Sequence, residues 1–311
     1  MNTNRNFVYL LVILAMFFWG LSFVWTSIVF QYLNPITTVF IRLIISTSLL
    51  FPILKLMGKL ERIQKKDYKL FMVSALLNPF LYFLGESYGV KLSTPTIAAV
   101  VIATIPVFSP VAAYFFLKER LKPVNFIGLA ISFFGILIML MRKGMSLDAN
   151  IIGVMCLLFA VISAVFYSIV LKKLSNHYSA FTIVTYQNLL GALYFLPFVF
   201  LIDGSSLTAI QIDFRLVSSI LLLAVFGSSL AFVFFTIGTR ELGVTRTNIF
   251  SNFIPLVTAV FSFFIIDERL STAKIIGMTL VILGVILAQM KGLSSFGGMY
   301  RFFVDRNQNT N

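Results

Sequence analysis

Long apolar runs, separated by short polar breaks, follow one another along almost the whole chain. A bilayer core about 30 Å thick requires roughly 20 apolar residues in a helix. Ten segments of about that length lie between charged residues or Pro, Gly and Asn: residues 7–30, 35–57, 69–90, 94–117, 123–142, 150–171, 180–202, 214–238, 245–266 and 272–290. We therefore predict an all-α membrane protein with ten transmembrane helices.

The composition agrees with this prediction and narrows the function. Of the 311 residues, 59% are hydrophobic and only 11% are charged, whereas a soluble domain needs about 25% charged residues to cover its surface. One Cys and one His exclude an internal disulfide and leave too few ligands for an ordinary zinc site. The sequence carries no phosphate-binding loop and no spacing typical of a catalytic triad. We expect no metal, no cofactor and no enzymatic activity.

The positions of the basic residues predict the orientation of the chain, because Lys and Arg are retained on the cytoplasmic side of a membrane. Of the 24 basic residues, 17 lie in the N-terminal segment, the loops on the same side and the tail; 6 lie on the opposite side, and Arg42 lies inside a span. Both termini are therefore predicted to be cytoplasmic, in a bacterial inner membrane. The net charge of +13 is explained by the basic loops that orient the chain beside anionic lipid headgroups. It therefore does not indicate binding of nucleic acid.

The chain contains an internal repeat. An offset of 149 residues aligns Pro106 with Pro255, Glu119 with Glu268, Gly128 with Gly277 and Gly135 with Gly284. We call residues 1–145 the first copy and residues 150–291 the second copy; a short cytoplasmic tail follows at 292–311. Because each copy has an odd number of helices, five, the two copies are predicted to insert with opposite orientation. Such inverted repeats are typical of secondary transporters, which rock one half against the other.

These residues resemble the EamA family of the drug/metabolite transporter superfamily. The resemblance rests on Trp19-Gly20 in the first helix, on Arg42 in the second, and on the spacing of Pro, Glu, Gly and Gly that both copies share. It implies a ten-helix exporter or importer of small metabolites, and it leaves the substrate open. The second copy departs from the first, because Gln187 stands where the first copy has Arg42.

Two opposite charges lie inside predicted spans. A charge in hydrocarbon costs at least about 3 kcal/mol unless it faces a cavity or a partner, so Arg42 is predicted to recognise an anionic group such as a carboxylate. The alternatives are a structural ion pair or a side chain that reaches the membrane surface. Glu86 shares a helical stripe with Asn78 and Tyr82. It is a partner for Arg42, a proton-coupling carboxylate, or a helix-end residue without a role.

Other polar or aromatic residues inside spans complete the predicted substrate site. Trp19 lies near the middle of its span, where a cavity wall is expected rather than an interfacial anchor. Asn248 and Asn252 are four residues apart in the ninth predicted helix, and Gln187 aligns with Arg42. Amides inside lipid need partners, either a solute or another helix, so these three residues either contact substrate or join helices.

The repeated residues are assigned structural roles. Pro106 and Pro255 are predicted to bend equivalent helices where gating could occur. Gly128, Gly135, Gly277 and Gly284 are predicted to let helices approach closely. Glu119 and Glu268 are expected to fix a tight turn by accepting hydrogen bonds from amides that open the next helix.

The sequence as a whole predicts a secondary active transporter, an exporter of small metabolites such as amino acids, working by alternating access. Its expected partners are a small-molecule substrate and the lipid bilayer, and protons are the candidate coupling ion. A drug or nucleobase permease is the alternative within transport. A receptor or scaffold that has lost transport is the alternative outside it.

Overall fold

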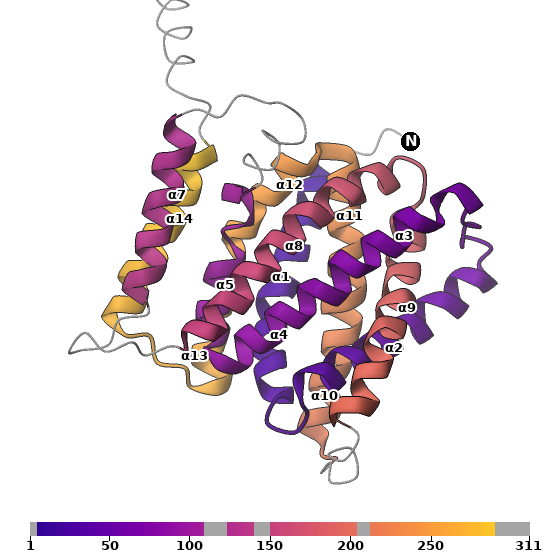
Figure 1. Ribbon diagram of the computed structural model, residues 1–311, viewed down its shortest axis with the longest axis horizontal. Helices are drawn as coiled ribbons and strands as arrows, with labels where there is room; N and C mark the ends of the chain where they lie inside the picture. The colour runs from indigo at the N-terminus through magenta and orange to yellow at the C-terminus, as the bar shows by residue number, and fades with distance from the viewer. Residues whose placement is uncertain (1–4, 109–122, 140–149, 204–211, 290–311) are drawn as a thin grey trace, which may run out of the picture.

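The computed structural model describes residues 5–108, 123–139, 150–203 and 212–289, and every regular element within these ranges is a helix (Figure 1). The elements of the first copy are α1 (Arg5–Val29), α2 (Pro35–Leu56), η1 (Lys65–Asp67), α3 (Tyr68–Ala75), η2 (Leu76–Leu81), α4 (Tyr82–Leu92), α5 (Pro95–Ile102) and α7 (Pro123–Met139). Those of the second copy are α8 (Ile151–Ser175), α9 (Ala180–Phe198), η3 (Val199–Asp203), α10 (Phe214–Leu222), η5 (Leu223–Leu230), α11 (Ala231–Leu242), α12 (Val244–Ile249), η6 (Phe250–Phe253), α13 (Ile254–Ile266) and α14 (Thr272–Gln289). The all-helical prediction is confirmed for the described residues.

Seven helical stretches are long and apolar enough to cross a membrane. They are Arg5–Val29, Pro35–Leu56, Lys65–Leu92, Ile151–Ser175, Ala180–Asp203, Phe214–Leu242 and Arg246–Ile266. The other three predicted segments contain shorter apolar helices, Pro95–Phe108, Pro123–Met139 and Thr272–Leu287. The chain is therefore a multi-pass membrane protein, and the full count of ten spans stays a prediction.

The same long helix is interrupted in both copies. Segment η2 joins α3 to α4 across a kink at Asn78, whose backbone is non-helical, and segment η5 joins α10 to α11 as a π-helix, with backbone hydrogen bonds between residues five apart. The repeat offset of 149 places Leu76–Leu81 opposite 225–230, inside η5. The two interruptions therefore lie at equivalent positions of the repeat, and π-helical turns are frequent at functional sites.

Both aligned prolines follow a break in their helix. The chain leaves helical conformation at Ala103 and Thr104, just before Pro106. Pro255 lies in the first turn of α13, directly after the 3₁₀ turn η6. Proline is tolerated there because its missing N–H would have no intrahelical partner. The structure thus contains an interruption beside each proline, and a role in gating stays a prediction.

Helices α7 and α14 lie side by side along their lengths, at the left edge of the molecule in Figure 1. A Cβ atom added to Gly135 would lie 2.7 Å from the carbonyl oxygen of Gly277, and one added to Gly284 would lie 2.7 Å from the carbonyl oxygen of Gly128. These distances are too short for any side chain. The four repeated glycines therefore lie where the two equivalent helices come closest.

Helices α2 and α9 also lie against each other, and they run antiparallel. The start of α2 meets the end of the α9 stretch, where Asp203 accepts hydrogen bonds from the amide (3.2 Å) and hydroxyl (2.7 Å) of Thr37. Beyond the other end of α2, Glu61 accepts a hydrogen bond from the amide of Ser179 (2.6 Å), which precedes α9. An acid from each copy thus caps the equivalent helix of the other copy, where the helix dipole favours negative charge.

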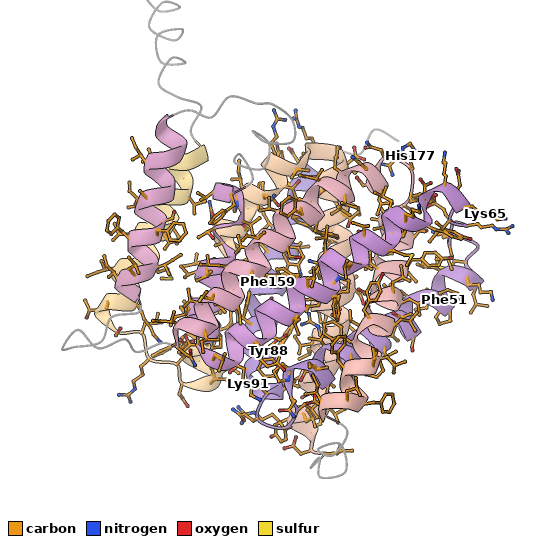
Figure 2. The ribbon with its side chains drawn as sticks, viewed as in Figure 1. Phe51, Lys65, Tyr88, Lys91, Phe159 and His177 are labelled. Atoms are coloured by element: carbon orange, nitrogen blue, oxygen red, sulfur yellow. The ribbon has the colours of Figure 1, made fainter. Side chains whose placement is uncertain are left out.

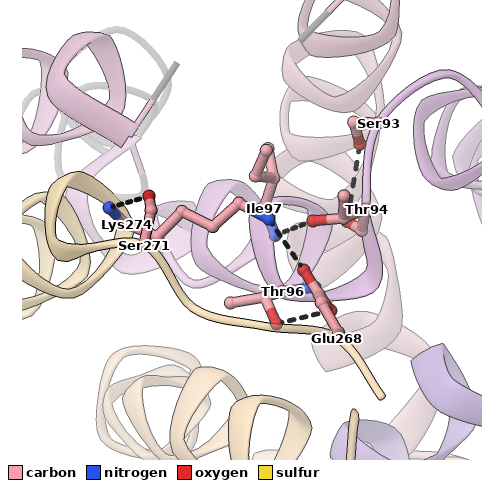
Figure 3. Close-up of polar contacts among 7 residues, drawn as sticks. All are labelled: Ser93, Thr94, Thr96, Ile97, Glu268, Ser271 and Lys274. Carbon is pink, nitrogen blue, oxygen red and sulfur yellow. Dashed lines mark hydrogen bonds and ion pairs between the residues drawn. The ribbon is translucent and has the colours of Figure 1, made fainter. Parts of the chain in front are cut away.

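Glu268 makes a third contact between the copies, which corrects one expectation. Its carboxylate accepts hydrogen bonds from the hydroxyl (2.8 Å) and the amide (3.4 Å) of Thr96, in the first turn of α5 (Figure 3). It also pairs with Lys274 of α14 at 3.1 Å. The described amides that open α14 do not bind the carboxylate, whose two oxygens are instead taken by Thr96 and Lys274. Glu119 lies outside the described residues.

Basic side chains lie at both ends of the helical bundle. Figure 2 shows His177 and Lys65 at one end and Lys91 at the other. Lys91 donates a hydrogen bond to the side chain of Asn34 (3.1 Å), beside the cap at the start of α2. Between these ends the interior contains many buried Ser, Thr, Asn and Gln side chains as well as apolar ones.

Candidate functional site

A cavity lies among α1, α2, α4, α8, α11 and the α12–α13 stretch. Its empty space is about 610 Å³ with the opening included, which is within the range of pockets that bind small molecules. The lining residues are Trp19, Ser22, Phe23, Arg42, Asn78, Tyr82, Phe83, Glu86, Ile102, Ile105, Ala164, Tyr167, Ser168, Phe232, Phe235, Asn248, Ser251 and Ile254.

Arg42 is the most completely buried charge of the described chain, with 2% of its surface exposed. Its Nε atom donates a hydrogen bond to the hydroxyl of Ser228 (2.7 Å), and its guanidinium carbon lies 4.3 Å from the centre of the Phe83 ring. The terminal nitrogens Nη1 and Nη2 make no hydrogen bond with any described residue. These two nitrogens, which together can donate to both oxygens of a carboxylate, are thus available to a ligand.

Glu86 provides the opposite charge on the wall of the same cavity, with 6% of its surface exposed. One carboxylate oxygen accepts a hydrogen bond from the hydroxyl of Tyr82 (3.1 Å), one helical turn earlier. No nitrogen of Arg42 lies within 4.0 Å of this carboxylate, so these two described side chains form no direct ion pair. Both charges therefore lack the direct partner that burial in lipid would demand.

Aromatic rings form the apolar part of the wall. The Trp19 ring centre lies 5.0 Å from that of Phe232 and 5.0 Å from that of Phe235, and Phe83 contacts Phe232 at 6.0 Å. The indole N–H of Trp19 donates to the carbonyl oxygen of Gly227 (3.2 Å). Trp19 is thus fixed as a wall of the cavity rather than placed at the membrane surface.

Six of the eight predicted substrate residues meet at this cavity: Trp19, Arg42, Asn78, Tyr82, Glu86 and Asn248. They come from helices that are far apart in the sequence. The backbone of Asn78 is non-helical (φ −146°, ψ 119°), so the stripe of Asn78, Tyr82 and Glu86 does not follow one straight α-helix. The interruption at η2 nevertheless leaves all three side chains on the cavity wall.

Gln187 lies outside the cavity. Its amide nitrogen donates to the hydroxyl of Ser74 (2.9 Å) and to the carbonyl oxygen of Asn78 (3.0 Å), and its amide oxygen accepts from Tyr167 (3.3 Å). Each of these partners belongs to a neighbouring helix. The structure therefore favours the helix-joining role among the two that the sequence left open.

Asn252 also lies outside the cavity, in an open groove with Ile13, Ile249, Phe250 and Phe253. The predicted spacing of Asn248 and Asn252 assumed a continuous α-helix. The intervening residues form the 3₁₀ turn η6, which advances about 120° per residue instead of about 100°. The extra rotation turns Asn252 away from the face that carries Asn248.

Several residues at or beside the cavity could not be predicted from the sequence. Phe83, Phe232 and Phe235 belong to a chain with 35 Phe residues, in which an aromatic residue at a helical position marks no site. Tyr167 and Ser168 likewise lacked a charge or motif. Ser228, which holds Arg42, could have been suspected only from the repeat, which places it opposite Pro79.

The described part of the cavity wall carries a single carboxylate, that of Glu86. The described residues include no cluster of three or more His, Cys, Asp or Glu side chains. The wall instead combines one guanidinium, one carboxylate, hydroxyls and aromatic rings, a set suited to binding a small polar molecule that carries an apolar part.

Comparisons with known proteins agree with this geometry. Residues 6–141 and 151–290 each match the EamA-like transporter family. An uncharacterized transporter of Archaeoglobus fulgidus is 24% identical over 283 residues, which cover 91% of this chain and 99% of that protein. The uncharacterized transporter YetK of Bacillus subtilis is 27% identical over 81% of this chain and 77% of its own length.

A solved crystal structure shares the fold, with a TM-score of 0.68 and 17% sequence identity over 92% of this chain and 99% of that one. The family match and the names of the relatives point to transport rather than to enzymatic chemistry. The chain belongs to the EamA-like transporter family of multi-pass membrane proteins.

Proposed function

We propose that the protein is a secondary active transporter that exports small zwitterionic metabolites, amino acids above all, across the bacterial inner membrane. The observation that supports this best is Arg42, buried beside the cavity with both terminal nitrogens unoccupied. A buried guanidinium without a carboxylate partner is costly. A substrate carboxylate would supply that partner.

The rest of the wall supports an amino acid over a simple acid. Glu86 offers a carboxylate oxygen to a substrate ammonium group, while Tyr82 holds the other oxygen. Trp19, Phe232 and Phe235 offer an apolar surface to a side chain. When no ammonium group is bound, Glu86 is also the carboxylate that would take up a proton, which makes protons the proposed coupling ion.

The proposed mechanism is alternating access by ten transmembrane helices arranged as two inverted copies, with both termini cytoplasmic. In support, the copies are joined at both ends of the α2–α9 pair, through Asp203 at one end and Glu61 at the other. Rocking one copy against the other would open one end while the other stays closed. No ATP-binding motif exists in the sequence to drive such motion.

Counterflow in vesicles tests the proposal. Purified protein is reconstituted with an unlabelled amino acid inside, and entry of the labelled compound is followed with and without an imposed proton gradient. We expect labelled amino acids to accumulate transiently and unlabelled ones to compete. Direction is measured separately, by comparing the amino acids retained and released by cells that lack or overproduce the protein.

Competition by other compounds decides between the candidates. If the flux of a labelled compound is abolished by nucleobases or cationic drugs and not by amino acids, the protein is a drug or nucleobase permease. Binding of a ligand without flux of any compound would favour a receptor. Either result would overturn the proposal.

A further inference from the structure

The π-helical segment η5 of the second copy holds two cavity residues of the first copy. The hydroxyl of Ser228 accepts the hydrogen bond from Arg42 Nε (2.7 Å). The carbonyl oxygen of the preceding residue, Gly227, accepts the one from the Trp19 indole (3.2 Å). The only hydrogen bond that the Arg42 side chain makes with the described residues is therefore to the other copy.

The π-helical backbone explains why this segment can bind side chains. In a π-turn the regular pattern of backbone bonds is interrupted, so carbonyl oxygens become available to other donors. The carbonyl oxygen of Ser228 accepts a hydrogen bond from Asn188 (2.9 Å), and that of Ala224 accepts one from the Ser229 hydroxyl (2.8 Å). Segment η5 is thus held by a hydrogen bond from Asn188 of α9 and by one within the segment itself.

We propose that Ser228 and Gly227 position Arg42 and thereby determine recognition of the substrate carboxylate. Ser228 orients the guanidinium through Nε, which leaves Nη1 and Nη2 available to a ligand in the cavity that Arg42 lines. This inference rests on the proposed function only in taking Arg42 as the carboxylate anchor. Ser228 is not among the lining residues, so it acts through Arg42 as a positioning residue.

Gly227 contributes by having no side chain. A Cβ atom there would lie 3.1 Å from Arg42 Nη2 and 3.2 Å from Ser22 Cβ. Both distances are tighter than ordinary contacts, so a methyl group there requires the guanidinium or Ser22 to shift by a few tenths of an ångström. Because Arg42 and η5 belong to different copies, any movement of one copy relative to the other would also shift the Arg42 guanidinium.

The first copy provides a matched control. Gln187 of the second copy, the counterpart of Arg42, donates hydrogen bonds to the carbonyl oxygen of Asn78 in η2 and to the hydroxyl of Ser74, both in the first copy. Ser74 is fully buried, as Ser228 is, and it does not line the cavity. Replacing Ser74 therefore removes a comparable buried hydroxyl without touching Arg42.

The experiment compares benzoate with benzamide, which have the same ring and differ in the carboxylate. Binding to the full-length protein in detergent is followed by the fluorescence of Trp19, made the single tryptophan by Trp25→Phe. We expect the unmodified site to prefer benzoate. Ser228→Ala and Gly227→Ala should each reduce that preference about tenfold or more, because a hydrogen bond to a charged group orients the anchor. Ser74→Ala should retain it.

The outcomes separate this inference from the proposed function. A benzoate preference that survives in folded Ser228→Ala and Gly227→Ala protein would overturn it, as would an equal loss in Ser74→Ala or the absence of any preference in the unmodified site. If Ser228→Ala does not fold, the benzoate preference of Gly227→Ala, which keeps the Ser228 hydroxyl, decides whether the inference holds. Failure of amino-acid counterflow together with the expected pattern for benzoate would overturn only the proposed function.

Discussion

Arg42 and Gln187 occupy equivalent positions in α2 and α9, and each donates a hydrogen bond to the interrupted segment of the other copy, η5 for Arg42 and η2 for Gln187. All the polar atoms of the Gln187 side chain have partners in the protein. Arg42 commits one nitrogen and leaves two. If Arg42 binds substrate as proposed, this one difference between the copies converts a residue that joins helices into a binding group, while both residues keep their hydrogen bond to the other copy.

Glu86→Gln tests the second charge of the cavity. Glutamine has the same size and still accepts the hydrogen bond from Tyr82, but it cannot balance an ammonium group. We expect the Michaelis constant for an amino acid to rise about tenfold, the scale of a lost hydrogen bond between charged groups, while benzoate binds as before. Glu241→Gln, a change at a surface pair with Arg240, is the control. Unchanged transport in Glu86→Gln would remove Glu86 from the site.

At the scale of helices, rare residue types could be predicted from the sequence, whereas the orientation and the interruptions of helices could not. The charged and tryptophan positions could be predicted because such residues are rare inside apolar helices. For Gln187 and Asn252 the sequence left two roles open, because their orientation depends on neighbouring helices and on the 3₁₀ turn η6, which no residue type indicates. The π-helical segments were also missed, since Leu223–Leu230 is as apolar as the α-helices on either side.

Gly284→Ala tests the contact between α7 and α14. The new methyl group would lie 2.7 Å from the backbone at both Gly128 and Ser132, and backbone cannot move aside as a side chain can. We expect a loss of about 1–3 kcal/mol of stability, as for overpacked cores, seen as a lower midpoint of thermal unfolding in detergent. Leu283→Ala, at an exposed position beside it, should have a smaller effect. Equal midpoints for Gly284→Ala and the unmodified protein would show that the helices are not held at this distance.

At the scale of the whole molecule, acids at opposite ends of the α2–α9 pair join the two copies. Asp203 binds Thr37 at one end, and Glu61 binds the amide of Ser179 at the other. The repeat in the sequence predicted two copies, but it could not predict these contacts, because Asp203 and Glu61 do not align with each other. They arise only when the copies are folded together.

Cross-linking at one end tests alternating access. In a Cys156→Ala background, Thr37→Cys and Asp203→Cys place two thiols where the side chains are 2.7 Å apart. Joining them with a short thiol reagent should abolish counterflow, and reduction should restore it, because the two copies must separate there in each cycle. Glu61→Cys with Ser179→Cys should behave alike at the other end. Full transport by the cross-linked protein would contradict the mechanism.

The most direct test of the central claim compares counterflow by Arg42→Ala and Arg240→Ala with that by the unmodified protein. Arg240 is an exposed arginine outside the cavity, so its removal controls for the loss of a positive charge. We predict that Arg42→Ala inserts and folds but loses amino-acid flux at least about tenfold, the scale of one lost charged hydrogen bond, and that Arg240→Ala transports normally. Normal amino-acid flux by Arg42→Ala would contradict the account.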